Sequence, residues 1–254
     1  MGEILLDANN FLNFQDTPWD SKVLSVKTNE ITNIRYSNED LLYKSIADFE
    51  KYCVIHKYLF TNTRINPDDQ IIRKVLSDQG YLNTETSLLV DRVVNNFNTD
   101  DIGNLKFSLR EYEIQDIEEL KAISFDIFNH GRFFEDPYIS EEIARTRNKN
   151  WIYDLMATSK IIVGEINTTM FGFMAFRVEG NRASLQLGGV KNNFTIYSYP
   201  FWHKFFLELI DKYEVKYISG LVSASNIRIL NLYSYFGFKF SKAYFGYHKH
   251  RNIK

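Results

Sequence analysis

The stretch NIRILNLYSYFGF, residues 226–238, decides the fold prediction for this chain. Its apolar residues recur at helical spacing, and Gly237 suits the positive φ that commonly ends a helix. Phe238 then begins a strand that enters the core. An Asn side chain at a helix start can satisfy exposed backbone donors, and Asn226 is placed to do so. Seven residues on, Tyr233 would bring a hydroxyl group two turns further along the same helix.

The residues that lead up to this helix alternate between strand and helix patterns. We expect a strand at 105–110, helices at 114–128 and 141–156, a long hairpin at 160–178 and 182–190, a helix at 200–213, a strand at 217–223, a helix at 227–236 and a final strand at 238–247. Strands that alternate with helices in this way predict an α/β fold, with helices on the faces of a sheet.

The spacing of Asn226, Tyr233, Gly237 and Phe238, taken with this order of elements, resembles the GNAT superfamily of acyl-CoA-dependent N-acyltransferases. The resemblance implies that acyl-CoA is the co-substrate and that Tyr233 protonates the departing thiolate as general acid. It also implies that Asn226 reaches an amide of the pantetheine arm. A plainer alternative stays open, in which Asn226 is only a helix cap and Tyr233 only a half-buried aromatic residue.

In that superfamily the thioester lies in a gap between the fourth and fifth strands, and the counterpart here is ASLQLGGV, residues 183–190. The two adjacent glycines are suited to a bulge that would splay the strand, although they could also ease an ordinary strand end. The resemblance therefore implies a CoA-binding strand. Its predicted cofactor-binding residues are Leu185, Gln186, Leu187, Gly188, Gly189 and Val190.

The loop that should hold the pyrophosphate of CoA departs from the family pattern. GNAT enzymes usually use a glycine-containing loop at a helix N-terminus. This chain has KNNFTIYSYPFW at 191–202, without any glycine. Because backbone amides bind anions without needing glycine, and because Pro200 suits the first turn of a helix, we expect a modified anion site. Its residues would be Asn193, Thr195, Tyr197 and Ser198.

The N-terminal part of the chain is predicted to form a domain of its own. Strands are expected at 23–34, 54–60 and 86–94, with helices at 37–52 and 66–80, which indicates a small mixed sheet with helical cover. The polar stretch NNFNTDDIGN at 95–104 lacks periodicity and is the best candidate for a linker. We therefore expect an N-terminal α/β domain at 1–100 and a GNAT domain at 101–254, with the boundary near Asp100.

The segment RFFEDPYISEEIARTRNKNWI, residues 132–152, resembles the GNAT branch that acylates nucleotide-linked amino sugars, typified by dTDP-fucosamine acetyltransferases. A tyrosine common in that branch is replaced by Arg147. A Trp-Asp-Ser near the N-terminus is present as Trp19, Asp20 and Ser21, without the Phe-Gly that usually follows. The other matching positions are Arg132, Phe133, Asp136, Pro137, Ile139, Ala144 and Trp151, with Arg64, Gly80, Tyr81 and Thr86 in the first domain.

This narrower resemblance implies an acceptor, a dTDP-linked 3-amino-3,6-dideoxy or 4-amino-4,6-dideoxy hexose, acylated for a surface polysaccharide such as O-antigen. The acyl group would be acetyl, the family default, or a longer one such as 3-hydroxybutyryl. Arg132 offers a cation for phosphate, Phe133 an aromatic face and Asp136 a carboxylate for the ammonium, unless this loop is only a capped, solvated turn. The predicted substrate-binding residues are Arg132, Phe133, Asp136, Trp19, Asp20 and His203.

The group that takes the proton from the amine is not identified by the sequence. The fourth strand carries Gln186, which cannot hold a proton, so ordered water, Asp136 or His203 would have to serve. His248 and His250 share one face of a predicted strand, but no third ligand is evident. We therefore expect no metal.

Bulk composition excludes several other classes of function. The chain has 254 residues, 44% of them hydrophobic, and its 30 basic and 32 acidic residues form no long block, so a nucleic-acid partner is not expected. Cys53 is the single cysteine, and no signal peptide or stretch of about 18 apolar residues is present, which favours a cytoplasmic protein without a membrane partner. A protein or peptide N-acetyltransferase, a catalytically degenerate GNAT binding module and a homodimer all remain compatible with the sequence.

Overall fold

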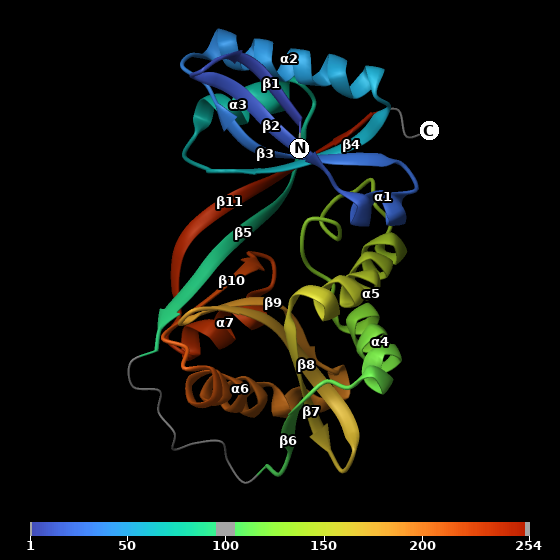
Figure 1. Cartoon of the computed structure of the whole chain (residues 1–254), viewed down its shortest axis with the longest axis vertical. Coiled ribbons are helices and arrows are strands. Elements are labelled where there is room, and N and C mark those ends of the chain that lie inside the picture. The colour runs from blue at the N-terminus through green and yellow to red at the C-terminus, as the bar shows by residue number, and fades with distance from the viewer. Residues whose placement is uncertain (1, 95–104, 252–254) are drawn as a thin grey trace.

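A mixed β-sheet of 11 strands runs through the computed structural model, which describes residues 2–94 and 105–251 (Figure 1). The strands follow the order β1-β2-β3-β4-β11-β5-β10-β9-β8-β7-β6 across the sheet. Their bounds are β1 Gly2–Asp7, β2 Asn10–Asp16, β3 Lys27–Arg35, β4 Tyr58–Ile65, β5 Leu82–Val93, β6 Ser108–Glu111, β7 Lys160–Ile166, β8 Thr169–Glu179, β9 Arg182–Val190, β10 Tyr217–Ser223 and β11 Lys239–His250. The linker predicted at 95–104 and the boundary near Asp100 lie outside the described residues.

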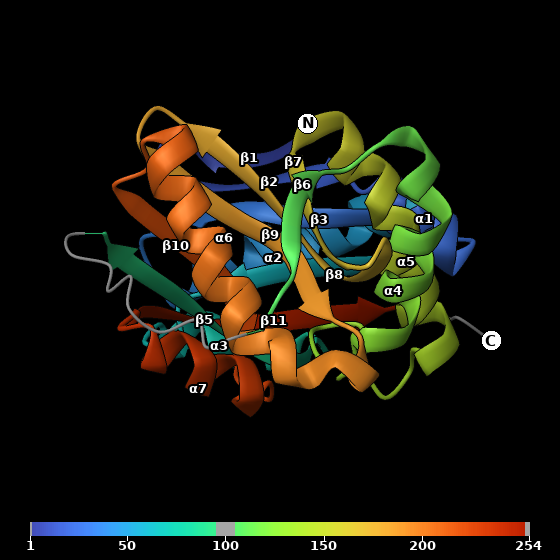
Figure 2. The same cartoon turned by 90° about the horizontal axis from the view of Figure 1, so that it is seen from below.

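Helices cover both faces of this sheet, as predicted for an α/β fold. They are α1 Pro18–Leu24, α2 Glu39–Ile55, α3 Gln70–Asp78, α4 Ile117–Ile127, α5 Glu141–Thr158, α6 Ser198–Tyr213 and α7 Ile227–Tyr235, with 3-10 turns η1 Ile114–Asp116 and η2 Asn192–Tyr197. Figure 2 shows α6 lying across the strands of the C-terminal half, with α4 and α5 grouped to one side. Among the described residues, no helix combines the length and apolar character that crossing a membrane requires.

The helices of the C-terminal half form two layers, one on each face of the sheet, and successive side chains of a strand pack against different layers. Ile161 and Val163 of β7 belong to the apolar cluster under α4 and α5, whereas Ile162 between them belongs to the cluster under α6 and α7. Successive side chains of a strand point to opposite faces of the sheet. The predicted order of elements in this half is therefore confirmed, together with the reason for it.

The N-terminal half differs from its prediction at several places. Strands β1 and β2 were not predicted, and the helix expected from residue 66 begins at Gln70. The strand expected from residue 23 begins at Lys27, because Pro18 starts helix α1, which runs to Leu24. The strand expected at 54–60 begins at Tyr58, because α2 continues to Ile55. Val54 is 70% exposed and Ile55 is 73% exposed. These β-branched residues therefore lie on the solvent side of the helix end and not in the core.

The two halves of the chain exchange their last strands. β5, which ends the N-terminal half, pairs antiparallel with β10 of the C-terminal half. β11, which ends the C-terminal half, pairs antiparallel with β4 and with β5. Figure 1 shows β5 and β11 as two long ribbons that run between the upper and lower parts of the molecule. The halves therefore share one backbone hydrogen-bond network.

Candidate active site

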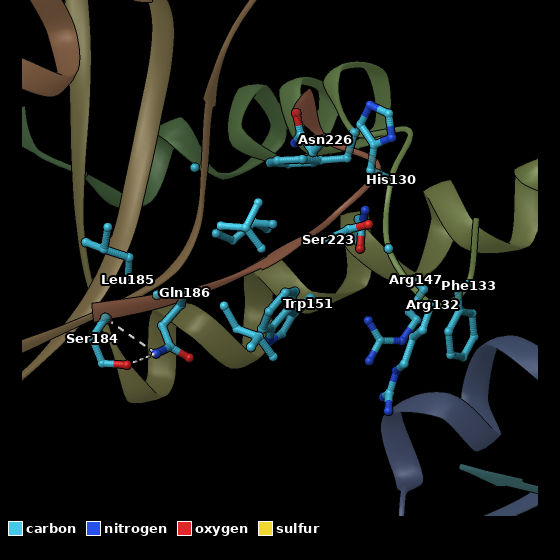
Figure 3. Close-up of a pocket in the computed structure, with 18 of the residues that line it drawn as sticks. His130, Arg132, Phe133, Arg147, Trp151, Ser184, Leu185, Gln186, Ser223 and Asn226 are labelled. Carbon is cyan, nitrogen blue, oxygen red and sulfur yellow. Dashed lines mark hydrogen bonds between the residues drawn. The ribbon is translucent and has the colours of Figure 1, made fainter. Parts of the chain in front are cut away.

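A cavity of about 1090 Å³ lies between the two halves and is lined by residues from both (Figure 3). That volume lies slightly above the usual range for ligand pockets, which is roughly 300–1,000 Å³. The N-terminal half contributes Pro18, Trp19, Lys22, Glu30, Arg64, Glu85 and Leu89. The C-terminal half contributes residues of the loop at 128–140, of α5, α6 and α7, and of strands β8, β9 and β10. A ligand in this space would contact both halves at once.

One wall of the cavity is an opening between strands β9 and β10. The two strands pair in parallel from Arg182 opposite Tyr217 to Leu185 opposite Gly220. Beyond that point β9 continues to Val190 and β10 to Ser223, but their facing edges no longer pair with each other. A free backbone edge of this kind can bind an extended ligand as an additional strand.

The cause of the opening lies two residues before the predicted position. Along β8, Phe176 is opposite Leu185 and Ala175 is opposite Leu187, so Gln186 is the extra residue of a β-bulge. The side-chain amide of Gln186 donates to Ser184 Oγ at 2.9 Å. The bulge that we expected at the two following glycines is therefore at Gln186, which is one of the residues that line the cavity.

The glycines serve close packing behind the opening. A Cβ on Gly188 would lie 2.6 Å from the Sδ of Met174 and 2.8 Å from the carbonyl oxygen of Phe173, and one on Gly189 would meet Ile127. Neither distance leaves room for a side chain. Of the predicted CoA strand, Leu185, Gln186, Leu187 and Gly188 line the cavity, whereas Gly189 and Val190 are absent from its lining.

Tyr233 of α7 lines the same cavity and is 5% exposed. Its ring packs against Phe238, with the ring centroids 4.8 Å apart. Burial raises the pKa of Tyr233 to about 12 because the phenolate form loses solvation. The hydroxyl group is therefore protonated throughout the neutral range and can donate a proton or a hydrogen bond into the cavity.

Asn226 caps α7, since its side-chain oxygen accepts a hydrogen bond from the backbone N–H of Ile229 at 3.3 Å, and it also lines the cavity. We expect Asn226→Ala to lower the free energy of unfolding by about 1 kcal/mol. Asn38→Ala is the matched control, because Asn38 caps α2 in the same way through the N–H of Leu41 and is absent from the cavity lining. Urea unfolding of both variants measures the effect. A stable Asn226→Ala beside a destabilised Asn38→Ala would show that this cap bond contributes nothing.

Two arginines share one buried carboxylate at the far end of the cavity. Asp20 is completely buried, and its two oxygens accept from Arg147 Nε at 2.6 Å and from Arg132 Nη2 at 3.3 Å. Burial, together with repulsion from Arg132, lowers the pKa of Arg147. The guanidinium of Arg147 also lies over the ring of Phe133, 4.6 Å from its centroid. Figure 3 shows Arg132, Arg147 and Phe133 side by side.

Further charged and aromatic groups surround Arg132 and Arg147. Arg64 donates to Glu85 Oε2 at 3.1 Å, and all four residues Arg64, Glu85, Glu30 and Trp19 line the cavity. Trp19 is 43% exposed, so its ring is open to contact from a ligand. This end of the cavity thus offers cations, carboxylates and aromatic surface, whereas Asp20 lies behind the wall and holds the arginines in place.

Asp136 and His203, both predicted to contact substrate, are not brought to the cavity. Asp136 is 1% exposed, and its Oδ2 accepts from His248 Nδ1 at 2.6 Å and from His250 Nε2 at 2.7 Å. These bonds outweigh the effect of burial and lower the pKa of Asp136 below its usual range. His203 is 2% exposed within α6, and it lies against Tyr199. Neither side chain is therefore placed to contact a ligand in the cavity.

Asp136 also supplies the third polar partner of the histidine pair that the sequence left without one. Ligand atoms of Asp136, His248 and His250 lie within 4.8 Å of one another. Burial lowers the pKa of His248 to about 4, which favours its neutral form. The cluster ties the loop at 128–140 to β11, and this loop carries the cavity residues Arg132 and Phe133.

The predicted pyrophosphate site also lies away from the cavity lining. Asn193, Thr195 and Tyr197 are in η2, and Ser198 is the first residue of α6. None of these four residues is among those that line the cavity. The ring of Tyr197 packs against other aromatic rings, Phe107 and Phe171, at centroid distances of 6.1 Å and 5.2 Å. Binding of phosphate by these residues stays a prediction.

Sequence reasoning missed a hydrogen-bonded chain at the top of the cavity. His130 Nδ1 lies 3.0 Å from Ser225 Oγ, and Ser225 Oγ donates to Glu135 Oε1 at 2.7 Å. Ser223 Oγ donates to the same carboxylate oxygen at 2.6 Å. His130 and Ser223 line the cavity. The available signal was the run Ser223-Ala224-Ser225-Asn226 at the end of a predicted strand, where polar side chains often form a site.

No family model matches this chain. The spore coat polysaccharide biosynthesis protein SpsD of Bacillus subtilis (strain 168) is 23% identical over 240 residues, which cover 92% of this chain and 82% of SpsD. Among solved structures, a conserved protein of unknown function from Staphylococcus epidermidis superposes with a TM-score of 0.68 at 11% identity, over 98% of this chain and 94% of that one.

Two named acetyltransferase structures share the same architecture. A GCN5-related N-acetyltransferase from Sphaerobacter thermophilus gives a TM-score of 0.67 at 10% identity, over 96% of this chain and 77% of that one. A tandem GNAT protein from the clavulanic acid biosynthesis pathway gives 0.61 at 8% identity, over 89% and 76%. At these identities the likeness concerns the fold, and it confirms the fold predicted from residues 226–238.

Proposed function

We propose that this chain, whose fold is that of the GNAT acetyltransferases, is an acyl-CoA-dependent N-acyltransferase that acylates the amino group of a dTDP-linked amino-dideoxyhexose. The amine attacks the thioester directly, and Tyr233 protonates the departing sulfur as general acid. The product would serve surface polysaccharide synthesis. The acyl group is acetyl or a longer one such as 3-hydroxybutyryl.

The observation that carries this proposal is the continuity of the cavity. One wall has the opening between β9 and β10 with Tyr233, and another has the arginines Arg132 and Arg147. An acyltransferase of this kind must hold two large molecules so that an amine meets a thioester. A cavity of about 1090 Å³ that spans both halves of the chain has room for the reacting ends of both.

The chemistry of the far end suits a nucleoside diphosphate sugar. Arg132, Arg147 and Arg64 can bind phosphate oxygens, for which planar guanidinium groups are well matched. The rings of Trp19 and Trp151 line the same space and can stack on a base. Glu30 lines the same space and, in the place of the predicted Asp136, offers a carboxylate for the sugar ammonium. The description of SpsD as a polysaccharide biosynthesis protein supports a sugar acceptor.

The test is a direct assay of acyl transfer. The protein is incubated with acetyl-CoA or 3-hydroxybutyryl-CoA and with dTDP-linked 3-amino or 4-amino dideoxyhexoses. Release of CoA thiol is followed, and the sugar product is identified by its mass. We expect turnover with at least one aminosugar and none with dTDP-glucose, which has no amine. Absence of transfer to every dTDP-aminosugar would refute the proposal.

Calorimetry separates the proposal from its alternatives. Binding of both CoA and dTDP is expected. Binding of CoA alone would favour another acceptor, such as the N-terminus of a protein or peptide. The glycine-free stretch at 191–202, with the ring of Tyr197 packed among other aromatic rings, gives a reason to test for a catalytically degenerate binding module. That alternative predicts that neither CoA nor dTDP binds and that no CoA thiol is released.

A further inference from the structure

We infer that His130 is the group that takes the proton from the amine, held ready for this step by Ser225 and Glu135. The inference rests on the proposed function, because it assigns the proton acceptor of that reaction. His130 belongs to the loop at 128–140 and lines the cavity together with Tyr233. Figure 3 shows its ring on the cavity wall, close to Asn226.

The hydrogen bonds to Glu135 determine which way the hydroxyl groups of Ser223 and Ser225 donate. Glu135 Oε1 accepts from the backbone N–H of Gly131 at 2.9 Å, from Ser223 Oγ at 2.6 Å and from Ser225 Oγ at 2.7 Å. A carboxylate is the strongest acceptor available to these hydroxyl groups. The single hydroxyl proton of Ser225 is therefore committed to Glu135.

This commitment selects the tautomer of His130. Ser225 Oγ has only lone pairs left to offer, so the imidazole Nδ1, 3.0 Å away, must carry a hydrogen and donate it. In the neutral ring the other nitrogen, Nε2, then has a free lone pair. An oriented imidazole with its Nε2 lone pair available is the arrangement that general-base catalysis by histidine requires.

Other groups near the cavity are less suited to this task. Asp136 and His203 do not line it, and the side-chain amide of Gln186 does not accept a proton near neutral pH. Glu85 lines the cavity, but one of its carboxylate oxygens already accepts a hydrogen bond from Arg64 at 3.1 Å. His130 is the histidine of the cavity lining among the described residues.

The proton balance of the step is complete without a further reactant. One N–H bond of the sugar ammonium breaks, its electron pair stays on nitrogen, and the proton moves to His130 Nε2. The neutral amine attacks the thioester carbon, the C–S bond breaks with its electron pair on sulfur, and Tyr233 supplies the proton to the thiolate. The nitrogen then loses its second proton, which restores Tyr233 through solvent, and the imidazolium releases the first proton to water.

The test compares His130→Gln with His56→Gln in the intact enzyme. Gln can keep the hydrogen bond to Ser225 but cannot take a proton, whereas His56 is an exposed residue at the end of α2. We expect His130→Gln to lower kcat/KM at pH 7 about 100-fold, within the usual range for general-base catalysis, with CoA affinity retained. A general base acts only in its deprotonated form, so the wild-type activity should fall toward acidic pH along a limb that His130→Gln lacks. His56→Gln should behave as the wild type.

Substitutions of Ser225 provide a second test with a smaller expected effect, because they change only the hydrogen bond that orients His130. Ser225→Ala removes the acceptor for Nδ1–H and should lower kcat/KM about 10-fold, whereas Ser225→Thr keeps a hydroxyl group and should restore it. An unchanged pH profile and full activity in His130→Gln would overturn the inference while leaving the proposed function intact. A wild-type protein that transfers no acyl group to any dTDP-aminosugar would instead remove the proposed function, and the inference with it.

Discussion

Replacing Tyr233 by Phe is expected to lower kcat at least about 100-fold while leaving the Kd for acyl-CoA within about two-fold of its wild-type value. The substitution removes one oxygen atom and keeps the ring that packs against Phe238. The fold around α7 should therefore persist. What disappears is the proton donor for the departing sulfur, an interaction that matters only in the transition state.

The pKa of Tyr233 determines how this residue affects the pH profile of activity. Burial raises this pKa to about 12, so the hydroxyl group stays protonated from acidic pH to well above neutrality. Tyr233 should consequently contribute no limb to the pH profile below pH 10. An alkaline loss of activity would arise from this residue only as the pH approaches 12, where the phenol ionises and can no longer donate.

Tyr235→Phe is the matched control for this experiment. Tyr235 lies two residues along the same helix, so its side chain points elsewhere, and it is 73% exposed. We expect its kcat to equal that of the wild type. Stopped-flow or steady-state measurement of thiol release gives kcat, and calorimetry gives the Kd for acyl-CoA. A Tyr233→Phe enzyme with an unchanged kcat would exclude Tyr233 as the acid.

Local patterns were sufficient to predict the order of helices and strands in the C-terminal half. The strand expected at 217–223 has those bounds as β10, and Gly237 has the positive φ of 71° that its position after α7 suggested. Both features depend on residues that are neighbours in the sequence. Alternation and helix-end signals report on such neighbours directly, which is why they succeeded here.

The features that local patterns missed all depend on distant partners. Asp136 meets His248 and His250 only because the loop at 128–140 folds against β11. His130 meets Ser225 across 95 positions of the chain. The exchange of β5 and β11 between the two halves likewise pairs strands that no periodicity relates. Pairing of this kind is decided by the complete sheet, so the sequence of one segment cannot reveal it.

Short elements near the N-terminus were obscured for a different reason. Helix α1 is seven residues long, and Thr17 at its start makes no side-chain capping bond. Tertiary contacts hold it in place, among them the hydrogen bonds from Arg132 and Arg147 to Asp20. A charged residue in a short helix reads as a surface position until its partners, more than 100 residues away, are known.

Those partners make Asp20→Asn the substitution with the largest expected effect on stability. Asn has nearly the same volume as Asp, so no cavity forms, and the change consists of the loss of one negative charge. Arg132 and Arg147, whose side chains are 12% and 17% exposed, would then face each other without it. Breaking a buried ion pair by removing one partner costs about 3–5 kcal/mol. We expect a loss near the lower end of that range, because both arginines retain some access to water.

Urea unfolding measures this loss, and Asp48→Asn provides the comparison. Asp48 pairs with Lys51 on the surface of α2, where the lysine is 74% exposed, so its removal should cost at most about 1 kcal/mol. If Arg132 and Arg147 bind the diphosphate of the acceptor, Asp20→Asn should also raise the KM for the dTDP-aminosugar while the KM for acyl-CoA stays constant, because only the sugar end of the cavity depends on Asp20. Equal stability of the two variants would show that Asp20 does not anchor the arginines.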